Sequence, residues 1–132
     1  NTPFIQSGDI KEKFKAVCNG LDEILKNHGY AHEGKIFKVE KENTDTVALF
    51  CHFGVECVLL SHLLKISPMA LWQGFTALTS SVTTLVTEER EQGTAYFRCC
   101  GFSDISHLYA GNEPPSFQAR FCETYSNFDE RH

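Results

Sequence analysis

The chain has 132 residues, of which 42% are hydrophobic and 22% charged, a balance that favours one globular domain and excludes a disordered or fibrous chain. Its formal net charge is −5 and its lysines and arginines are not clustered, so we expect no nucleic-acid partner. No apolar run approaches the ~18 residues of a membrane span, so we expect no membrane association. The first residues resemble neither a signal peptide nor a natural start, which indicates a fragment or a processed product.

The six cysteines stand in apolar or helix-like stretches rather than in the loop-rich setting of a disulfide-stabilised secreted domain. Cys51 and Cys57 lie in apolar runs, and Cys99 and Cys100 are adjacent. A chain with enough apolar residues for a core does not need cross-links to fold. We therefore expect reduced thiols and a cytoplasmic protein.

The chain opens with a predicted helix over Ser7–Asn27, in which apolar residues recur with a period close to 3.6 residues. Gly29 follows its end and suits a left-handed position after the helix, and His28 suits the negative end of the helix dipole. Ile36–Val39 is a short strand candidate. The charged and polar residues 40–45 predict a surface loop.

Thr46–Cys51 is a continuous apolar run, which is typical of a strand covered on both faces in a parallel sheet. Val55–Leu64 is apolar nearly all round and predicts a largely buried helix. Ser67 and Pro68 predict the start of a further helix that continues to about Gly74, with the serine as N-cap and the proline in the first turn.

Two runs in the second half, residues 81–87 and 94–102, predict the strands of a hairpin. The polar residues Glu88–Gly93 between them predict a solvated turn. We predict a further helix from Pro114 to about Tyr125. The whole is an α/β chain with a thin sheet, and it offers too few strands to cover the apolar run Thr46–Cys51 on its sides.

His52 stands where this predicted strand gives way to a helix. Ligands of open α/β sheets bind at the carboxyl ends of strands, and the free N–H groups of a helix N-terminus favour an anion. A protonated imidazole there could bind phosphate or donate a proton. From placement alone, a phosphate-binding histidine and a purely structural one both stay open.

Four segments in order along the chain carry a resemblance to a known family: Phe50–Leu64, Ser67–Trp72, Ser80–Leu85 and Phe102–Leu108. Together they resemble the C-terminal half of the histidine phosphatase superfamily, the phosphoglycerate-mutase-like proteins. The resemblance implies a three-layer α/β/α sandwich, present here without its N-terminal part. Residues 1–132 would then form a single partial domain.

The resemblance also implies an activity. Members of this superfamily transfer phosphoryl groups from small phosphorylated metabolites through a phosphohistidine, without a metal or a cofactor. By position, His52 is similar to their second catalytic histidine, which binds the phosphate. Phe53 stands where glycine is commoner and would narrow the pocket, Gly54 would allow close approach of the backbone to phosphate, and His107 would support the pocket. Phosphatase and mutase activity both stay open.

One departure from the family is large, because the chain contains no Arg-His-Gly, the motif that holds the nucleophile; its one Arg-His pair is Arg131-His132. We therefore expect the C-terminal portion of a phosphatase or phosphomutase, inactive alone. The alternative is a non-catalytic module that binds a phosphorylated ligand or a partner protein. An uncovered flank of Thr46–Cys51 would favour a homodimer.

Two other chemistries are disfavoured. A zinc site would draw on cysteines and histidines that lack the short Cys-x2–4-Cys spacing of structural sites: Cys51, His52, Cys57, His62, Cys99, Cys100 and His107. We therefore expect no metal. A cysteine phosphatase would need an arginine about six residues after the cysteine to hold phosphate, and neither Cys51 nor Cys57 has one.

Four further positions are interpreted as structural. His62 is expected to be a structural histidine on a buried helix. Trp72 and Phe75 have near-helical spacing and are expected in the core. Asp104 is expected to cap a turn.

Overall fold

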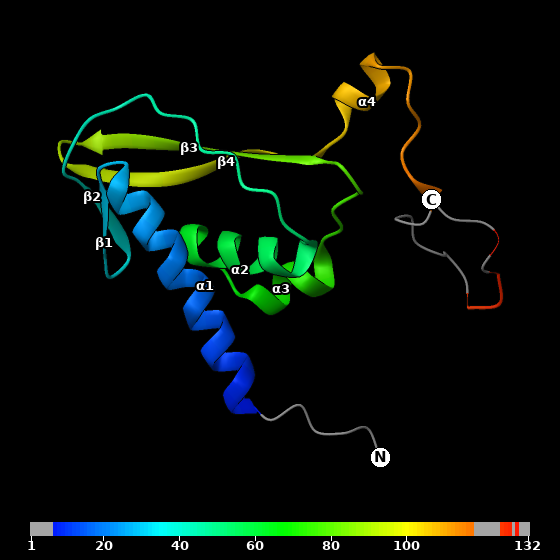
Figure 1. The fold of residues 1–132 in the computed structure, drawn as a ribbon, viewed down its shortest axis with the longest axis horizontal. Helices are drawn as coiled ribbons and strands as arrows, with labels where there is room; N and C mark the ends of the chain where they lie inside the picture. Colours follow the sequence, from blue (N-terminus) through cyan, green and yellow to red (C-terminus); the bar gives the residue numbers. More distant parts are fainter. Residues whose placement is uncertain (1–6, 118–124, 128, 130–132) are drawn as a thin grey trace. The chain divides into compact units, whose positions relative to one another are not determined.

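The computed structural model of the protein describes residues 7–117, 125–127 and 129 (Figure 1). The predicted helix from Pro114 to Tyr125 falls largely outside these residues. The helices and strands follow in the order α1 (Ser7–Asn27), β1 (Tyr30–Glu33), β2 (Ile36–Val39), α2 (Phe53–Leu64), α3 (Pro68–Gly74), β3 (Val82–Glu91), β4 (Thr94–Asp104) and α4 (Ser106–Ala110). Among the described residues, no helix has the length and apolar character needed to cross a bilayer.

The described chain divides into two compact units. The first holds α1, β1, β2, α2 and α3 together with Thr87–Arg98, the part of the β3–β4 hairpin nearest its turn. The second holds Thr76–Val86 and the described residues from Cys99 onward, including α4. The largest group of buried apolar side chains lies in the first unit.

The strands form a four-stranded antiparallel sheet in the order β1-β2-β4-β3. Tyr30 pairs with Val39 and Glu33 with Ile36 in the first hairpin, and Phe37 pairs with Ala95 where β2 meets β4. The mixed α/β content predicted from the sequence is confirmed. The sheet is not the parallel one that Thr46–Cys51 suggested, and the specific three-layer sandwich is not established.

Helix α1 has the predicted bounds, Ser7–Asn27, and Gly29 has the predicted left-handed backbone, with φ +86°. A Cβ at Gly29 would lie 2.4 Å from the backbone oxygen of Lys41, so glycine is required there on two counts. His28, just past the end of the helix, holds Asp45 with 2.7 Å between Nδ1 and Oδ2. This contact fastens the loop after β2 to the end of α1.

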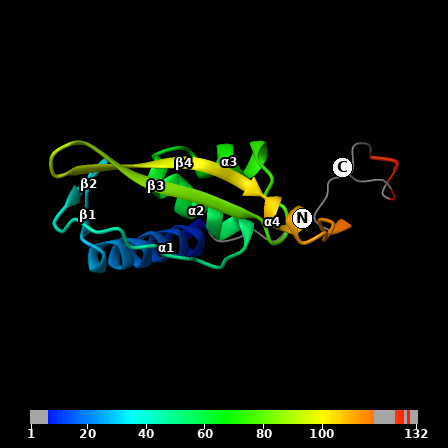
Figure 2. The ribbon, with the colours of Figure 1, turned by 90° about the horizontal axis from the view of Figure 1, so that it is seen from above.

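The core of the first unit lies where α1 covers β2 and the start of β4. Leu21 and Leu25 on α1 contact Phe37 and Ala95, each of which is only 1% exposed. Helix α1 also packs against β1 and α2, and Figure 2 shows both helices on the same side of the sheet. Burial of a phenylalanine side chain contributes about 1.5–3 kcal/mol, so Phe37 is the main anchor of this unit.

Helices α2 and α3 have nearly the predicted bounds, but α2 is less buried than predicted, because only its residues Cys57, Leu60 and Ser61 are buried. Helix α2 begins at Phe53, two residues before the predicted start at Val55. Ser67 is the N-cap of α3 as predicted, and its hydroxyl accepts a hydrogen bond of 3.4 Å from the backbone N–H of Ala70. The expectation that Trp72 and Phe75 are core residues is wrong: they are 57% and 49% exposed. Helix α3 is short and packs on α2, and this contact leaves about half of each side chain uncovered.

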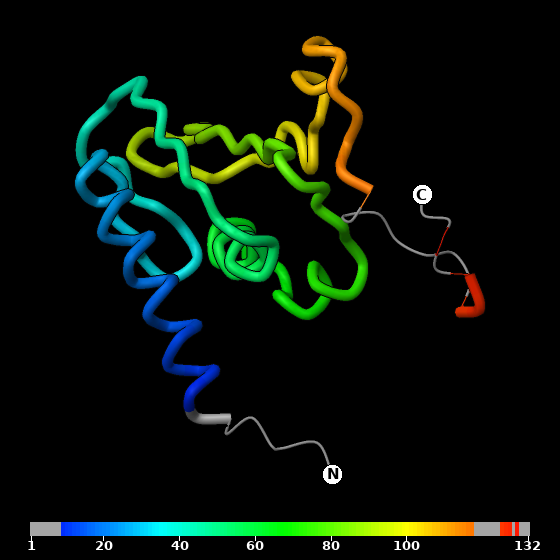
Figure 3. Tube along the Cα trace, turned by 45° about the vertical axis from the view of Figure 1, so that its right-hand side comes forward, coloured from blue at the N-terminus to red at the C-terminus, as the bar shows by residue number. Residues whose placement is uncertain are grey.

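The predicted buried strand over Thr46–Cys51 is wrong. The segment is extended but belongs to none of the strands, and all its residues are exposed. Leu49 is 47% exposed and Phe50 98% exposed. It belongs to the connection between β2 and α2, residues 40–52, whose course Figure 3 traces. An apolar run marks a chain segment that needs cover, but a strand also needs a neighbour to pair with, and the described sheet provides none.

The predicted hairpin is confirmed, but its turn is shorter than expected. Strand β3 continues to Glu91 and β4 begins at Thr94, so Glu88–Glu91 lies in the strand and not in a turn. The charges explain the difference, because the Glu88 carboxylate holds Arg90 on its own strand and Arg98 across the hairpin. Gly93 closes the turn with φ +81°.

In the second unit, Asp104 has the capping role predicted for it. Its carboxylate accepts hydrogen bonds from the backbone N–H and the hydroxyl of Ser106, at 3.0 and 2.6 Å. These bonds lower the pKa of Asp104 below its ordinary value. They also fix the start of the short helix α4, which the sequence pattern did not predict.

Candidate functional site

His52 occupies the N-cap position of α2, with an extended backbone at φ −87° and ψ 156°. Its carbonyl accepts hydrogen bonds from the N–H groups of Val55 and Glu56, at 2.9 and 3.0 Å. Its imidazole is exposed and does not cap the helix. The N–H groups of Phe53 and Gly54 belong to the first turn, where no residue four positions earlier lies inside the helix to accept from them. An exposed histidine therefore stands beside backbone donors and the positive end of the helix dipole.

Phe53 and Gly54 are both tied to Trp72 on α3. The Phe53 ring stacks on Trp72 with ring centroids 5.9 Å apart. A Cβ at Gly54 would lie 2.9 Å from Cζ3 of Trp72. The close approach at Gly54 thus serves a helix–helix contact, which is a different reason for glycine from the phosphate approach predicted from the sequence.

Glu56 lies in the same first turn of α2. Its carboxylate is favoured by the helix dipole, and together with burial it raises the pKa of the Cys51 thiol just before the helix, burial being the larger cause. This negative charge weakens the attraction that the helix end offers to an anion. The imidazole of His52 is thus the group at this end that can carry a positive charge to a phosphate.

His107 lies in the second unit, on α4 (Ser106–Ala110), where its backbone carbonyl accepts from the N–H of Gly111 at 3.0 Å. It is exposed. The predicted site residues therefore fall in two places: His52, Phe53 and Gly54 lie together at the start of α2, and His107 belongs to the other unit. Its role in supporting a pocket stays a prediction.

A second cluster of titratable groups is not predicted by the sequence pattern. It joins Asp22 on α1, His32 on β1 and His62 on α2. The Asp22 carboxylate contacts both imidazoles: Oδ1 lies 2.7 Å from Nε2 of His62 and Oδ2 lies 3.0 Å from Nδ1 of His32. The side chains of His62, His32 and Asp22 are 14%, 19% and 28% exposed, so the cluster is half-buried and reachable from solvent.

His32 is the most constrained member of this cluster. Its ring stacks on Phe37 with centroids 4.7 Å apart and meets the edge of the His62 ring at 4.6 Å. Its Nε2 lies 3.0 Å from the backbone oxygen of Gly34 and 2.7 Å from Nζ of Lys65. The orientation of the ring is therefore held by several neighbours within the first unit.

Lys65 reaches this cluster because it ends α2 with a left-handed backbone, at φ 58° and ψ 35°. Its ammonium lies 5.1 Å from the centre of the Phe37 ring, a cation–π distance. Burial lowers the pKa of Lys65, while the charge of Asp22 acts in the opposite direction.

The charges of the cluster are balanced around Asp22. Burial raises the pKa of its carboxyl group, but hydrogen bonds with His62 and then His32 outweigh burial, and the pKa is lowered overall. One helical turn earlier, Cys18 is buried, and burial followed by the Asp22 charge raises the pKa of its thiol. The cluster thus keeps its carboxylate ionised and its neighbouring thiol protonated.

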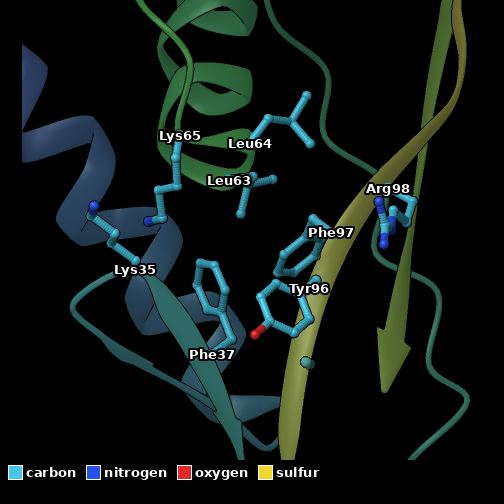
Figure 4. A pocket seen from close by; sticks show the side chains of 9 residues that line it. Lys35, Phe37, Leu63, Leu64, Lys65, Tyr96, Phe97 and Arg98 are labelled. Atoms are coloured by element: carbon cyan, nitrogen blue, oxygen red, sulfur yellow. The ribbon is translucent and has the colours of Figure 1, made fainter. Parts of the chain in front are cut away.

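A cavity of about 220 Å³ opens next to Lys65 (Figure 4). Its lining combines aromatic and aliphatic side chains with positive charges: Lys35, Phe37, Leu63, Leu64, Lys65, Ala95, Tyr96, Phe97 and Arg98. The Phe97 ring stands edge-on to Phe37, with centroids 4.9 Å apart. The cavity therefore has an apolar floor between the end of α2 and the sheet.

Few signals in the sequence indicate this cluster. Asp22 stands on the polar side of a helix pattern, and His32 lies on a strand that the pattern does not reveal. His62 is interpreted from the sequence as structural, and its contact with Asp22 agrees with that interpretation. The three side chains come together only because α1, β1 and α2 pack against one another.

Comparison with known proteins adds no identification: no protein-family model, no curated protein and no solved structure matches this chain. A functional assignment therefore depends on two groups of residues, the start of α2 with His52 and the cluster around Asp22.

Proposed function

We propose that this chain is the C-terminal portion of a domain similar to the histidine phosphatases, in which His52 contacts the phosphoryl group of a small phosphorylated metabolite. The observation that carries the proposal is the course of the chain at residues 46–52. An apolar, extended segment runs directly into an exposed histidine at the start of a helix. That is the order in which a central strand would present a histidine to a phosphate.

The exposure of this segment supports the incomplete form of the domain. Val47, Leu49 and Phe50 are 42%, 47% and 98% exposed, although apolar side chains gain about 25 cal/mol for each Å² that is buried. A sheet contributed by another part of the protein would cover them and would turn the segment into a paired strand. The same part would supply the nucleophilic histidine that the chain lacks. Alternatively, a second copy of the chain would cover these apolar side chains, and the protein would then be a homodimer.

The role proposed for His52 follows from the chemistry of phosphoryl transfer. Catalysis of this reaction depends on positioning and on cations that stabilise the charge of the transferred group. A protonated His52 and the N–H groups of Phe53 and Gly54 would contribute part of that stabilisation. Loss of one such donor lowers kcat by about 10²–10³.

The test uses the protein encoded by the complete reading frame that contains Asn1–His132. We expect it to hydrolyse p-nitrophenyl phosphate, to form an acid-labile phosphohistidine, and to lose about 10²-fold or more of kcat in His52→Ala. His28→Ala, at a partly exposed histidine away from the start of α2, is the matched control and should retain activity. Full activity in a folded His52→Ala variant would overturn the proposal.

The second candidate is a non-catalytic module that binds a phosphorylated ligand or a partner protein, and the absence of Arg-His-Gly from the chain favours it. It predicts different results for hydrolysis and phosphohistidine formation, and NMR would detect the binding of phosphate. Phosphate would shift the NMR signals of His52 and Gly54, no phosphohistidine would form, and hydrolysis would stay at the background rate.

A further inference from the structure

We propose that Asp22, His32 and His62 form a binding site for one divalent transition-metal ion, with Zn²⁺ as the probe. Each residue comes from a different element of the first unit, namely α1, β1 and α2. One donor atom from each lies within 4.8 Å of the others. The site is separate from His52, because His62 stands ten positions later on α2, about 15 Å along the helix axis.

The spacing of the donors suits a small ion. Zinc binds imidazole nitrogen and carboxylate oxygen at about 2.0–2.2 Å, which places tetrahedral donors ~3.4 Å apart. In the structure, Asp22 lies 2.7 Å from the His62 nitrogen and 3.0 Å from the His32 nitrogen. These two distances involve different carboxylate oxygens, Oδ1 and Oδ2, and an ion would have to lengthen each by less than about 1 Å. The three ligand atoms already lie within 4.8 Å of one another.

The groups around His32 suit a metal ligand. A ligating histidine usually donates its second ring N–H to a carbonyl or a carboxylate. Without an ion, Nε2 of His32 accepts from the Lys65 ammonium, 2.7 Å away. If Nδ1 binds the ion and Lys65 moves aside, Nε2 carries the proton and can donate to the Gly34 carbonyl, 3.0 Å away. Stacking on Phe37 holds the plane of the ring. The contacts of His32 within β1 and β2 therefore already hold its ring in a fixed plane, as a metal ligand requires.

The donor set also limits which ion would bind. Two imidazoles and one carboxylate suit Zn²⁺ and its neighbours in the first transition row, whereas Mg²⁺ and Ca²⁺ prefer oxygen ligands. The three side chains are between 14% and 28% exposed, so solvent reaches the cluster. An ion there would keep a position for water or a further ligand, as catalytic zinc sites with three protein ligands do.

The positive charge of Lys65 would weaken the binding of a metal ion at this site. Its ammonium lies 2.7 Å from Nε2 of His32, so it places a positive charge beside the site. Removal of this charge should strengthen metal binding, whereas it should weaken a cluster that is held together only by hydrogen bonds and charge. This opposite response makes Lys65→Met a sharp test of the proposal.

The test measures Zn²⁺ and Co²⁺ binding by the purified protein after treatment with a chelator. We expect one equivalent of ion, a Co²⁺ visible spectrum without the thiolate charge-transfer band, and a melting temperature that rises with Zn²⁺. Asp22→Asn, His32→Gln and His62→Gln should each weaken binding by about 100-fold or more, beyond the 10- to 100-fold effect of outer-shell changes. Lys65→Met should tighten it.

The exposed pair His28 and Asp45, 2.7 Å apart, provides matched controls. His28→Gln and Asp45→Asn should leave the affinity for Zn²⁺ unchanged. Circular dichroism would establish that each variant is folded, and Asp22→Glu, which keeps the carboxylate, covers the case in which Asp22→Asn does not fold. Three results would overturn the proposal: no stoichiometric binding, a thiolate band that assigns the ion to cysteines, or unchanged affinity in the folded ligand variants.

Discussion

Asp22 and His62 lie 2.7 Å apart between carboxylate oxygen and ring nitrogen, and this contact joins α1 to α2, which pack against each other. His32 shares the same carboxylate from β1. One acidic side chain therefore joins three elements of the first unit, and its loss would leave Nδ1 of His32 and Nε2 of His62 without the carboxylate that they contact.

We predict that Asp22→Asn lowers the free energy of unfolding by about 1–3 kcal/mol, the cost of a partly buried polar group that loses its charged partner. Urea denaturation in the presence of a chelator would measure it. Asp45→Asn, which alters an exposed pair with His28, should cost less than about 1 kcal/mol. Equal costs in the two variants would show that the Asp22 contact does not hold the elements together.

A second prediction concerns Gly54, where a Cβ would lie 2.9 Å from the Trp72 ring. Trp72 is 57% exposed and its ring can move, so we expect Gly54→Ala to change stability by no more than about 1 kcal/mol. Because Trp72 is the one tryptophan of the chain, its fluorescence should report the displacement. An unchanged spectrum would show that α2 and α3 do not approach this closely in solution.

Gly54→Ala also separates the two reasons for this glycine. If Gly54 serves only the contact with Trp72, the double variant Gly54→Ala/Trp72→Leu should bind phosphate as the original protein does. If the backbone must approach phosphate, the double variant should lose binding even though space for the methyl group has been made.

Where the sequence carries local signals, it predicts the structure. Ser67 and Pro68 predict the start of α3, and the apolar period of α1 with Gly29 after it predicts both ends of that helix. These features act through neighbours in the chain, by capping and by the permitted backbone angles. They require no knowledge of the rest of the fold.

Where the outcome depends on tertiary partners, prediction from the sequence fails. The apolar run Thr46–Cys51 predicts a buried strand, yet pairing and cover depend on other strands, which the described sheet does not offer. Strand β1 has no clear alternation and forms by pairing with β2. The cluster of Asp22, His32 and His62 escapes prediction for the same reason, since its members meet only when α1, β1 and α2 pack together.

A third prediction concerns self-association through residues 46–51. Leu49→Lys and Phe50→Lys replace exposed apolar side chains, so each should change stability by less than about 0.5 kcal/mol. Both should lower the apparent mass of the isolated chain in light scattering at high concentration, because an exposed apolar flank promotes association. Tyr109→Lys, at another exposed aromatic residue, is the control. The idea would be contradicted if all three variants behaved alike.

A fourth prediction addresses the core. Phe37 is 1% exposed and contacts residues of α1 and β4, so Phe37→Ala should lower the free energy of unfolding by about 3–5 kcal/mol. Tyr96, which follows the buried Ala95 on β4, is 42% exposed, and Tyr96→Ala should cost much less. Chemical denaturation of both variants would test this. A small effect of Phe37→Ala would show that Phe37 is not central to the hydrophobic core.

The last prediction concerns the thiols. Cys18 and Cys57 are buried, and burial, followed by a nearby carboxylate, raises the pKa of each thiol. The thiolate is the reactive form, so both burial and the raised pKa should slow alkylation. Cys99 is exposed and should react with iodoacetamide before either of them at neutral pH. Mass spectrometry of peptides after short exposure would give the order. Urea should remove the difference, since unfolding exposes these thiols and returns their pKa values to the ordinary range. Rapid labelling of Cys18 without urea would mean that α1 separates from β1 and α2 far more readily than its buried face indicates.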